Sequence, residues 1–187
     1  MALARRPEDW KVEMLNGNKI ISMSPAFSNH NIVKFNIQLI FGKYLENNVC
    51  MAMPDDTKVI LDDLNFVEPD FFVVCDRNKI KQDGIHGSPN LVVEVLSPST
   101  AKYDRGIKKD RYQNAGVQEY WLVEPDIKTV EAYLLKDGVY RLDEVYRYPN
   151  PLESEEDQAN AITQFNVNTF PELIVDLDNI FKNVFDW

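Results

Sequence analysis

The first part of the chain alternates between a strand pattern and a helical pattern. Residues 11–24 form two strand-like runs around Asn16-Gly17, a pair that predicts a β-hairpin with a type I′ turn. Ser28 or Asn29 can then cap a helix that extends to about Leu45. Its apolar positions recur at intervals of three and four and predict a broad apolar face formed by Ile32, Val33, Phe35, Ile37, Leu39, Ile40 and Tyr44.

Short β-rich runs follow this predicted helix, and a second helix separates them from three more strands. Ser99 or Thr100 can cap this helix, at about 101–115, and Gly116 is suited to end it. The early runs are VCMAM, TKVIL, FFVVC and NLVVEVL, with the loop DGIHGSPN before the last, and the later runs are EYWLVE, TVEAYLL and VYRLDEVY.

The last part of the chain is less regular. Residues 149–160 are polar and acidic, which predicts an exposed excursion, and FPELIVDLDNIF predicts a turn followed by a short docking helix. The order of hairpin, helix, strands, helix and strands predicts an α/β or α+β fold, a mixed sheet flanked by helices. We expect one domain over residues 1–187, with the acidic segment 149–187 docking on it.

Charge is distributed unevenly along the chain. The net charge of −10 argues against an anionic partner, but residues 153–187 contain eight acids and one base. The segment 102–111 holds five bases and two acids. Because a ligand responds to local charge, nucleic acid is not excluded, although a solvated helix face remains the default explanation of the basic segment taken alone.

The cysteines and the N-terminus bear on the cellular compartment. Cys50 and Cys75 are too few for a disulfide framework, and both lie in apolar runs, which predicts two buried thiols in a reducing compartment. The opening sequence MALARRPEDW lacks the apolar stretch of a signal peptide, and no apolar run approaches the roughly 20 residues that span a bilayer. We therefore expect a soluble, cytoplasmic protein.

Several common catalytic motifs are missing. The sequence has no phosphate-binding P-loop, no GxGxxG after a strand, no HExxH and no GxSxG. With two histidines, His30 and His86, a histidine-rich metal site is excluded. His30 opens the first predicted helix, where it is either structural or faces a cleft.

The most informative residue is Glu94, which lies inside the apolar strand LVVEVL. Alternation leaves apolar side chains on both faces of this strand, which predicts a central strand covered on both sides. An ionised carboxylate there is costly unless a cation compensates it, so Glu94 either pairs with Lys or Arg or binds a metal. Asp70 begins another apolar strand and favours the second reading. The two carboxylates and the main-chain carbonyl of Val95 would provide hard oxygen ligands for Mg²⁺.

The second predicted helix adds further residues to this candidate site. Asp104, Lys108 and Tyr112 are spaced by four residues and share one stripe. Lys108 could then reach the carboxylates and polarise the attacked phosphate or orient a water. Taken alone, Asp104 and Lys108 are better explained as an exposed ion pair.

Together these residues resemble the Uma-two family of restriction-endonuclease-like proteins, a branch of the PD-(D/E)xK nuclease superfamily. The resemblance covers about residues 10–148 and rests on VEMLNGNKI followed by MSP and His30, on EPDFFVVCD, on GIHGSPNLVVEVLSPST and on DRGIKKDRYQNAGVQEYWLVEP. It implies a restriction-endonuclease-like core, with a mixed sheet flanked by helices and a metal-dependent phosphodiesterase centre.

The resemblance also suggests roles for individual residues. Asp70 matches the Asp of the PD motif and Glu94 the acidic residue of (D/E)xK, while Leu96 stands where the motif lysine would be. The family pattern implies that this lysine has moved to the following helix, as Lys108 or alternatively Lys109. The resemblance further gives Glu13 as an accessory ligand and Tyr112 as support for the lysine, and Asn18 departs from an acidic residue common at its position.

Two hypotheses follow from the sequence. The first is an Mg²⁺- or Mn²⁺-dependent endonuclease in which Asp70 and Glu94 hold the metal and Lys108 helps to activate water. Its substrate would be DNA, with phosphate contacts from Lys102, Arg105, Lys109 and Arg111. The second is a catalytically weak or inactive nuclease fold that serves as a binding or scaffold module and forms a homodimer through its sheet.

Overall fold

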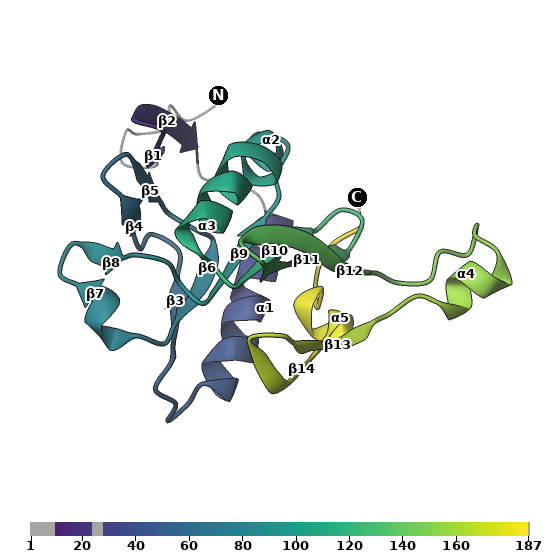
Figure 1. Cartoon of the computed structure of the whole chain (residues 1–187). Coiled ribbons are helices and arrows are strands. Elements are labelled where there is room, and N and C mark those ends of the chain that lie inside the picture. The colour runs from purple at the N-terminus through teal and green to yellow at the C-terminus, as the bar shows by residue number, and fades with distance from the viewer. Residues whose placement is uncertain (1–9, 24–27, 187) are drawn as a thin grey trace.

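A six-stranded mixed sheet forms around the two most apolar strands of the sequence (Figure 1). The structure is a computed structural model that describes residues 10–23 and 28–186, so the predicted hairpin end at Ser24 and the opening residues 1–9 lie outside the described residues. Within them, β9 runs parallel to β10 and antiparallel to β6. In spatial order the strands are β12 (Val139–Tyr146), β11 (Thr129–Lys136), β10 (Glu119–Glu124), β9 (Leu91–Val95), β6 (Phe71–Val74) and β3 (Met51–Pro54).

Both faces of this central sheet are covered, as the apolar pattern of β9 predicted. All five residues of β9 are buried. Leu91, Val93 and Val95 belong to the cluster that contains Val33, Ile37 and Phe41 of helix α1 (Ser28–Tyr44). Val92 belongs to the opposite cluster, with Tyr112.

The second predicted helix covers that opposite face, but it is not continuous. It consists of α2 (Ala101–Tyr103), a π-helical turn (Asp104–Lys108) and α3 (Lys109–Ala115), and Gly106 has non-helical backbone angles of φ −113° and ψ −108°. Gly116 ends α3 at φ 86°, the left-handed conformation that the sequence predicted there. The interruption lies next to Lys108.

A second six-stranded sheet within the described residues contains the predicted N-terminal hairpin. Asn16 and Gly17 both have positive φ, 54° and 73°, between β1 and β2. Strands β5, β7 and β8 were not predicted, and β8 lies in the stretch expected to be a loop. In order the strands are β2 (Asn18–Met23), β1 (Trp10–Leu15), β5 (Asn65–Val67), β4 (Val59–Asp62), β8 (Gly84–His86) and β7 (Ile80–Lys81), with a 3₁₀ turn (Arg77–Lys79) before β7.

The C-terminal part corrects one prediction and confirms another. The segment expected to be a turn is strand β14 (Phe170–Asp176), which pairs with β13 (Gln164–Val167) and leads into the short helix α5 (Leu177–Ile180). Residues 149–160, with α4 (Glu155–Ala159), form the predicted exposed excursion and project away from the body (Figure 1). No helix among the described residues is long and apolar enough to cross a membrane.

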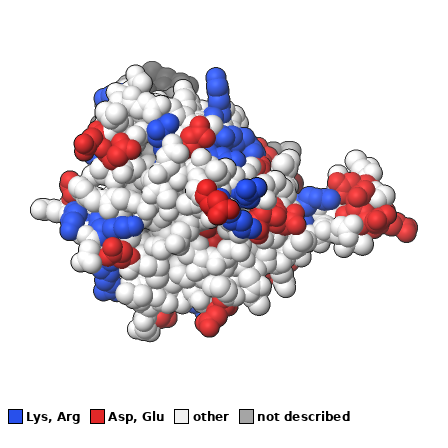
Figure 2. Space-filling model, in the orientation of Figure 1, with Lys and Arg blue, Asp and Glu red and all other residues white. Residues whose placement is uncertain are grey.

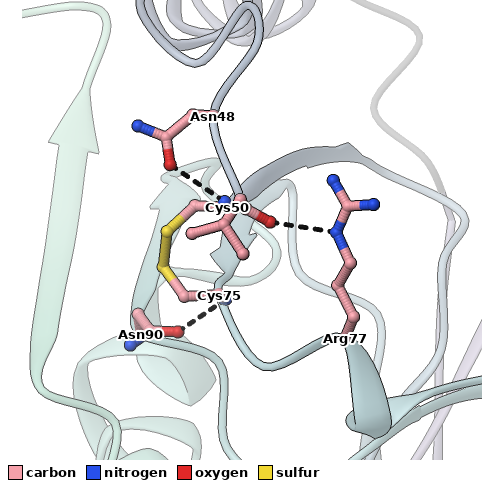
Figure 3. The surroundings of a disulfide bond; sticks show 6 residues. Asn48, Cys50, Cys75, Arg77 and Asn90 are labelled. Carbon is pink, nitrogen blue, oxygen red and sulfur yellow. Dashed lines mark hydrogen bonds between the residues drawn. A yellow bond between two sulfur atoms is a disulfide. The ribbon is translucent and has the colours of Figure 1, made fainter.

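The two cysteines are not free thiols. Cys50 and Cys75 form a disulfide, which corrects the prediction of two separate buried thiols (Figure 3). The antiparallel register opposes Met51 and Val74, so the residues one step beyond them meet as well. The Asn48 and Asn90 side chains accept hydrogen bonds from the backbone N–H groups of Cys50 and Cys75, at 3.0 and 2.9 Å.

Candidate active site

Asp70 and Glu94 lie on the same face of neighbouring strands. The register opposes Phe71 and Val93, which brings the two carboxylates together at the start of β6. The backbone N–H of Val95 donates to Asp70 Oδ2 at 2.9 Å, and that of Asp70 donates to Glu94 Oε2 at 3.4 Å. Both side chains are buried, so the site is an acidic pair within the protein rather than a surface cluster.

Lys108 lies at the centre of a group of carboxylates. Its Nζ is 2.6 Å from Glu94 Oε1, 3.2 Å from Glu13 Oε1 and 3.2 Å from Asp104 Oδ1. The hydroxyl of Tyr112 donates to Glu94 Oε1 at 2.6 Å. The stripe predicted on the second helix therefore faces the acidic pair, and the exposed ion-pair interpretation of Asp104 and Lys108 is wrong because both are buried.

The N-terminal hairpin closes the site from the other sheet. Glu13 on β1 accepts a hydrogen bond from the backbone N–H of Glu68 at 2.9 Å. Two residues earlier, Lys11 places its Nζ 3.6 Å from Asp70 Oδ1. The side chain of Lys11 is 17% exposed and that of Lys108 is 3% exposed. Of the two lysine side chains, that of Lys11 is therefore the less buried.

His30 approaches Asp70 from the first turn of α1. Its Nε2 is 3.3 Å from Asp70 Oδ2. Its buried Nδ1 has no hydrogen-bond partner within residues 10–23 and 28–186. The histidine therefore lies against the acidic pair, as one of the two interpretations of its sequence position allowed.

Burial and neighbouring charges shift the pKa values of these groups in opposite directions. Burial raises the pKa of Glu94 to about 7, although the charge of Lys108 opposes the shift. Burial also disfavours ionisation of Asp70, but the Lys11 charge and the His30 hydrogen bond outweigh it, and the pKa of Asp70 is well below its usual value. Burial disfavours the charged form of Lys108, yet Glu13 and Glu94 raise its pKa well above the usual value.

Three further residues that the sequence singled out do not join the acidic cluster. Leu96 is buried in the core, so the position of the motif lysine is apolar, and Asn18 donates to the backbone oxygen of Asn16 in the hairpin turn instead of facing the site. Lys109 does not join the carboxylates, because its Nζ lies 3.4 Å from the ring centroid of Tyr133.

The basic segment is less available to a substrate than its sequence suggests. Arg105 forms ion pairs with Glu131 and, at 3.9 Å, with Glu124. Arg111 is half-buried. Lys102 is exposed, without an ion-pair partner among the described residues. Of the predicted phosphate contacts, Lys102 is thus the one whose charge is not already engaged or partly buried.

Two members of the cluster were not among the predicted site residues. The sequence patterns did not identify Lys11, and they indicated Asp104 only as a partner of Lys108. A signal for Lys11 was present, because Lys11 and Glu13 alternate in phase with Leu15, whose side chain is 1% exposed. Charged residues on the buried face of a strand indicate a polar site beneath it.

Comparisons with known proteins agree with this fold. A solved structure from Anabaena variabilis, described as "a putative nuclease belonging to DUF820", matches with a TM-score of 0.69 and 18% identity, over 93% of this chain and 91% of that one. The fold is thus a mixed α/β fold of the restriction-endonuclease-like type.

The family follows from sequence. The model of the Uma2 (Uma-two) family, described as "Putative restriction endonuclease", matches residues 1–168. The Synechocystis protein slr1290 is 34% identical over 129 residues, which are 68% of this chain and 67% of slr1290. Its relative sll1609 from the same organism is 28% identical over 127 residues, 66% of this chain and 71% of sll1609. The chain belongs to the Uma2 family, which confirms the resemblance, and the family indicates a nuclease.

Proposed function

We propose that this protein is an Mg²⁺- or Mn²⁺-dependent endonuclease that hydrolyses phosphodiester bonds of DNA. The observation that carries the proposal is the pairing of Asp70 and Glu94 on one face of adjacent strands, with the Lys108 ammonium 2.6 Å from Glu94. A nuclease needs negative oxygen ligands and positive groups within reach of one phosphate, and this cluster contains both.

The donor set fits a hard divalent cation. The four carboxyl groups of Glu13, Asp70, Glu94 and Asp104 outnumber the two ammonium groups of Lys11 and Lys108, so the buried cluster has an excess of negative charge once all four are ionised. No group of three or more His, Cys, Asp or Glu side chains within the described residues is arranged to enclose a metal. The pair of Asp70 and Glu94 suits Mg²⁺, since this ion is commonly held by one or two carboxylates together with water and substrate oxygens.

In this proposal each residue has a distinct task. Asp70, Glu94 and the main-chain carbonyl of Val95 hold the metal, which when bound would stabilise charge on the scissile phosphate. Lys108 orients the attacking water. Glu13, His30 and Tyr112 are positioning residues, because they contact the carboxylates or the lysine.

We assign the ammonium of Lys11, the less buried of the two lysine side chains, to the substrate phosphate. It lies beside Asp70, whereas Lys108 is enclosed by carboxylates. Lys102, at the start of the second helix, would add a phosphate contact that positions the duplex without specifying its sequence.

Plasmid nicking tests the proposal directly. Supercoiled plasmid, single-stranded DNA and RNA are incubated with the protein in Mg²⁺, Mn²⁺ or EDTA. We expect metal-dependent nicking that Glu94→Ala and Lys108→Ala abolish and that Lys11→Met slows at least tenfold, while Lys19→Met on the same hairpin leaves it unchanged. Intact substrates under all conditions, with no metal bound by calorimetry, would overturn the proposal and favour a scaffold module.

A further inference from the structure

Residues 149–160 form an arm that is attached to the rest of the fold at its base. The backbone N–H of Arg147 donates to the carbonyl of Ile162 at 3.1 Å and closes that base. Beyond it, Ser154 caps α4, and Gln158 Nε2 donates to the carbonyl of Glu153 at 2.9 Å. Within the described part of the chain, the hydrogen bonds of the arm join residues between 147 and 162 to one another. The arm is therefore ordered by itself and projects from the body (Figure 1).

The arm combines one large apolar side chain with a high density of acids. Leu152 is 93% exposed. Glu153, Glu155, Glu156 and Asp157 follow it in sequence, and 149–160 contains no basic residue. Figure 2 shows this acidic group at the tip of the arm. The arm thus presents a leucine within a negatively charged surface.

A groove between α1, β14 and α5 on the body of the protein combines apolar side chains with positive charge. It has a volume of about 560 Å³. Leu39 and Ile174 line it and are 55% and 63% exposed, so two large apolar side chains face solvent there. Lys43 and Lys182 also line the groove, and neither has an ion-pair partner among residues 10–23 and 28–186.

The chemistry of the groove matches that of the arm. The nine residues that line the groove include two lysines and no acid, whereas the arm has four acids and no base. Burying a leucine side chain between apolar residues stabilises a complex, because it removes apolar surface from water. Opposite charges around that contact select the partner and its orientation.

We propose that the arm of one copy docks into the α1–β14–α5 groove of a second copy of this chain. Leu152 lies between Leu39 and Ile174, and the acids of α4 face Lys43 and Lys182. Because each copy offers one arm and one groove, a two-fold axis makes both contacts at once and closes the assembly as a dimer. This interface differs from dimerisation through the central sheet.

A charge-swap experiment tests this assignment. Variant one carries Glu155→Lys and Glu156→Lys in the arm, and variant two carries Lys43→Glu and Lys182→Glu in the groove. In a homodimer of either variant, both contacts bring like charges together. In a mixed dimer, the lysine arm of variant one meets the glutamate groove of variant two, and the native arm of variant two meets the native groove of variant one.

The measurement is the dimer dissociation constant by analytical ultracentrifugation at low salt. We expect a dimer for the unmodified chain, at least tenfold weaker association for each variant alone, and recovery of the dimer in an equimolar mixture. Leu152→Asp should also weaken the dimer at least tenfold, while Leu64→Asp, at a residue 58% exposed on the other sheet, should not. A monomeric unmodified chain, or a dimer insensitive to Leu152→Asp and to the charge swap, would overturn the proposal.

Discussion

Replacing Lys108 with methionine should strongly destabilise the folded protein. The substitution keeps most of the apolar stem and removes the ammonium that Glu94, Glu13 and Asp104 approach at 2.6, 3.2 and 3.2 Å. All four side chains are buried, so water cannot replace the lost charge. What remains is a cluster of carboxylates in an apolar environment.

The size of the effect follows from breaking a buried ion pair. Removing one partner of such a pair costs about 3–5 kcal/mol. Protonation of the remaining carboxylates limits the cost, because burial already raises the pKa of Glu94 and of Asp104. For a domain of this size, 1 kcal/mol corresponds to about 2–4 °C in Tm, so the Tm should fall by about 6–20 °C.

Thermal unfolding followed by circular dichroism in EDTA measures this change. Lys102→Met is the matched control, since it makes the same substitution at an exposed position of the same helical segment and should leave the Tm unchanged. Lys108→Arg, which retains the charge, should keep more of the stability than Lys108→Met. If Lys108→Met unfolds within about 2 °C of the unmodified chain, less than 1 kcal/mol is involved, and the ammonium does not hold the carboxylates together.

The proposed metal, the buried charges and the disulfide make three further outcomes measurable. At a Mn²⁺ concentration about 100 times its Kd, the Tm should rise by about 5–11 °C, and Asp70→Asn and Glu94→Gln should each abolish the rise; a full rise in either variant rules out that ligand. In EDTA, the free energy of unfolding should fall as pH rises from about 5 to 7, because Glu94, whose pKa is raised to about 7, holds its proton in the folded protein but not in the unfolded chain. Urea titrations of Glu94→Gln should show a flatter profile, and an unchanged slope would assign the effect elsewhere. Cys50→Ser should cost about 3 kcal/mol, because the disulfide closes a loop between residues 25 apart. Reductant should lower the stability of the unmodified chain but not of this variant, and two free thiols in the unfolded, unreduced protein would contradict the bond.

The acidic pair could be predicted from sequence because it depends on local patterns. Apolar residues on both sides of Glu94 indicate a buried strand, and a strand-starting Asp70 follows a proline. Each observation requires only the alternation of side chains along one strand. The spacing left room for the two strands to be neighbours, although residues 75–90 between them contain β7 and β8 of the other sheet.

Residues that depend on contacts between distant segments were harder to predict. The disulfide requires that β3 and β6 pair in one register, and the sequence spacing of the cysteines does not specify a register. The basic segment 102–111 was expected to supply phosphate contacts from Lys102, Arg105, Lys109 and Arg111. Its charges instead point in different directions around an interrupted helix, with Lys108 inward and Arg105 toward Glu131.

The apolar face of α1 shows a different limit of pattern analysis. Hydrophobic periodicity predicted one broad face, and Val33 and Ile37 are indeed fully buried, but Phe35 and Leu39 remain 58% and 55% exposed. On β14, Ile174 occupies the exposed position between buried Leu173 and Val175 although it is apolar. Hydrophobic periodicity identifies side chains that favour an apolar contact, but it does not tell whether the contact lies within the chain or with a second copy. Leu39 of α1 and Ile174 of β14 remain exposed at one groove, and the charge of that groove is opposite to the charge of the arm 149–160. This arrangement fits a contact between two copies of the chain.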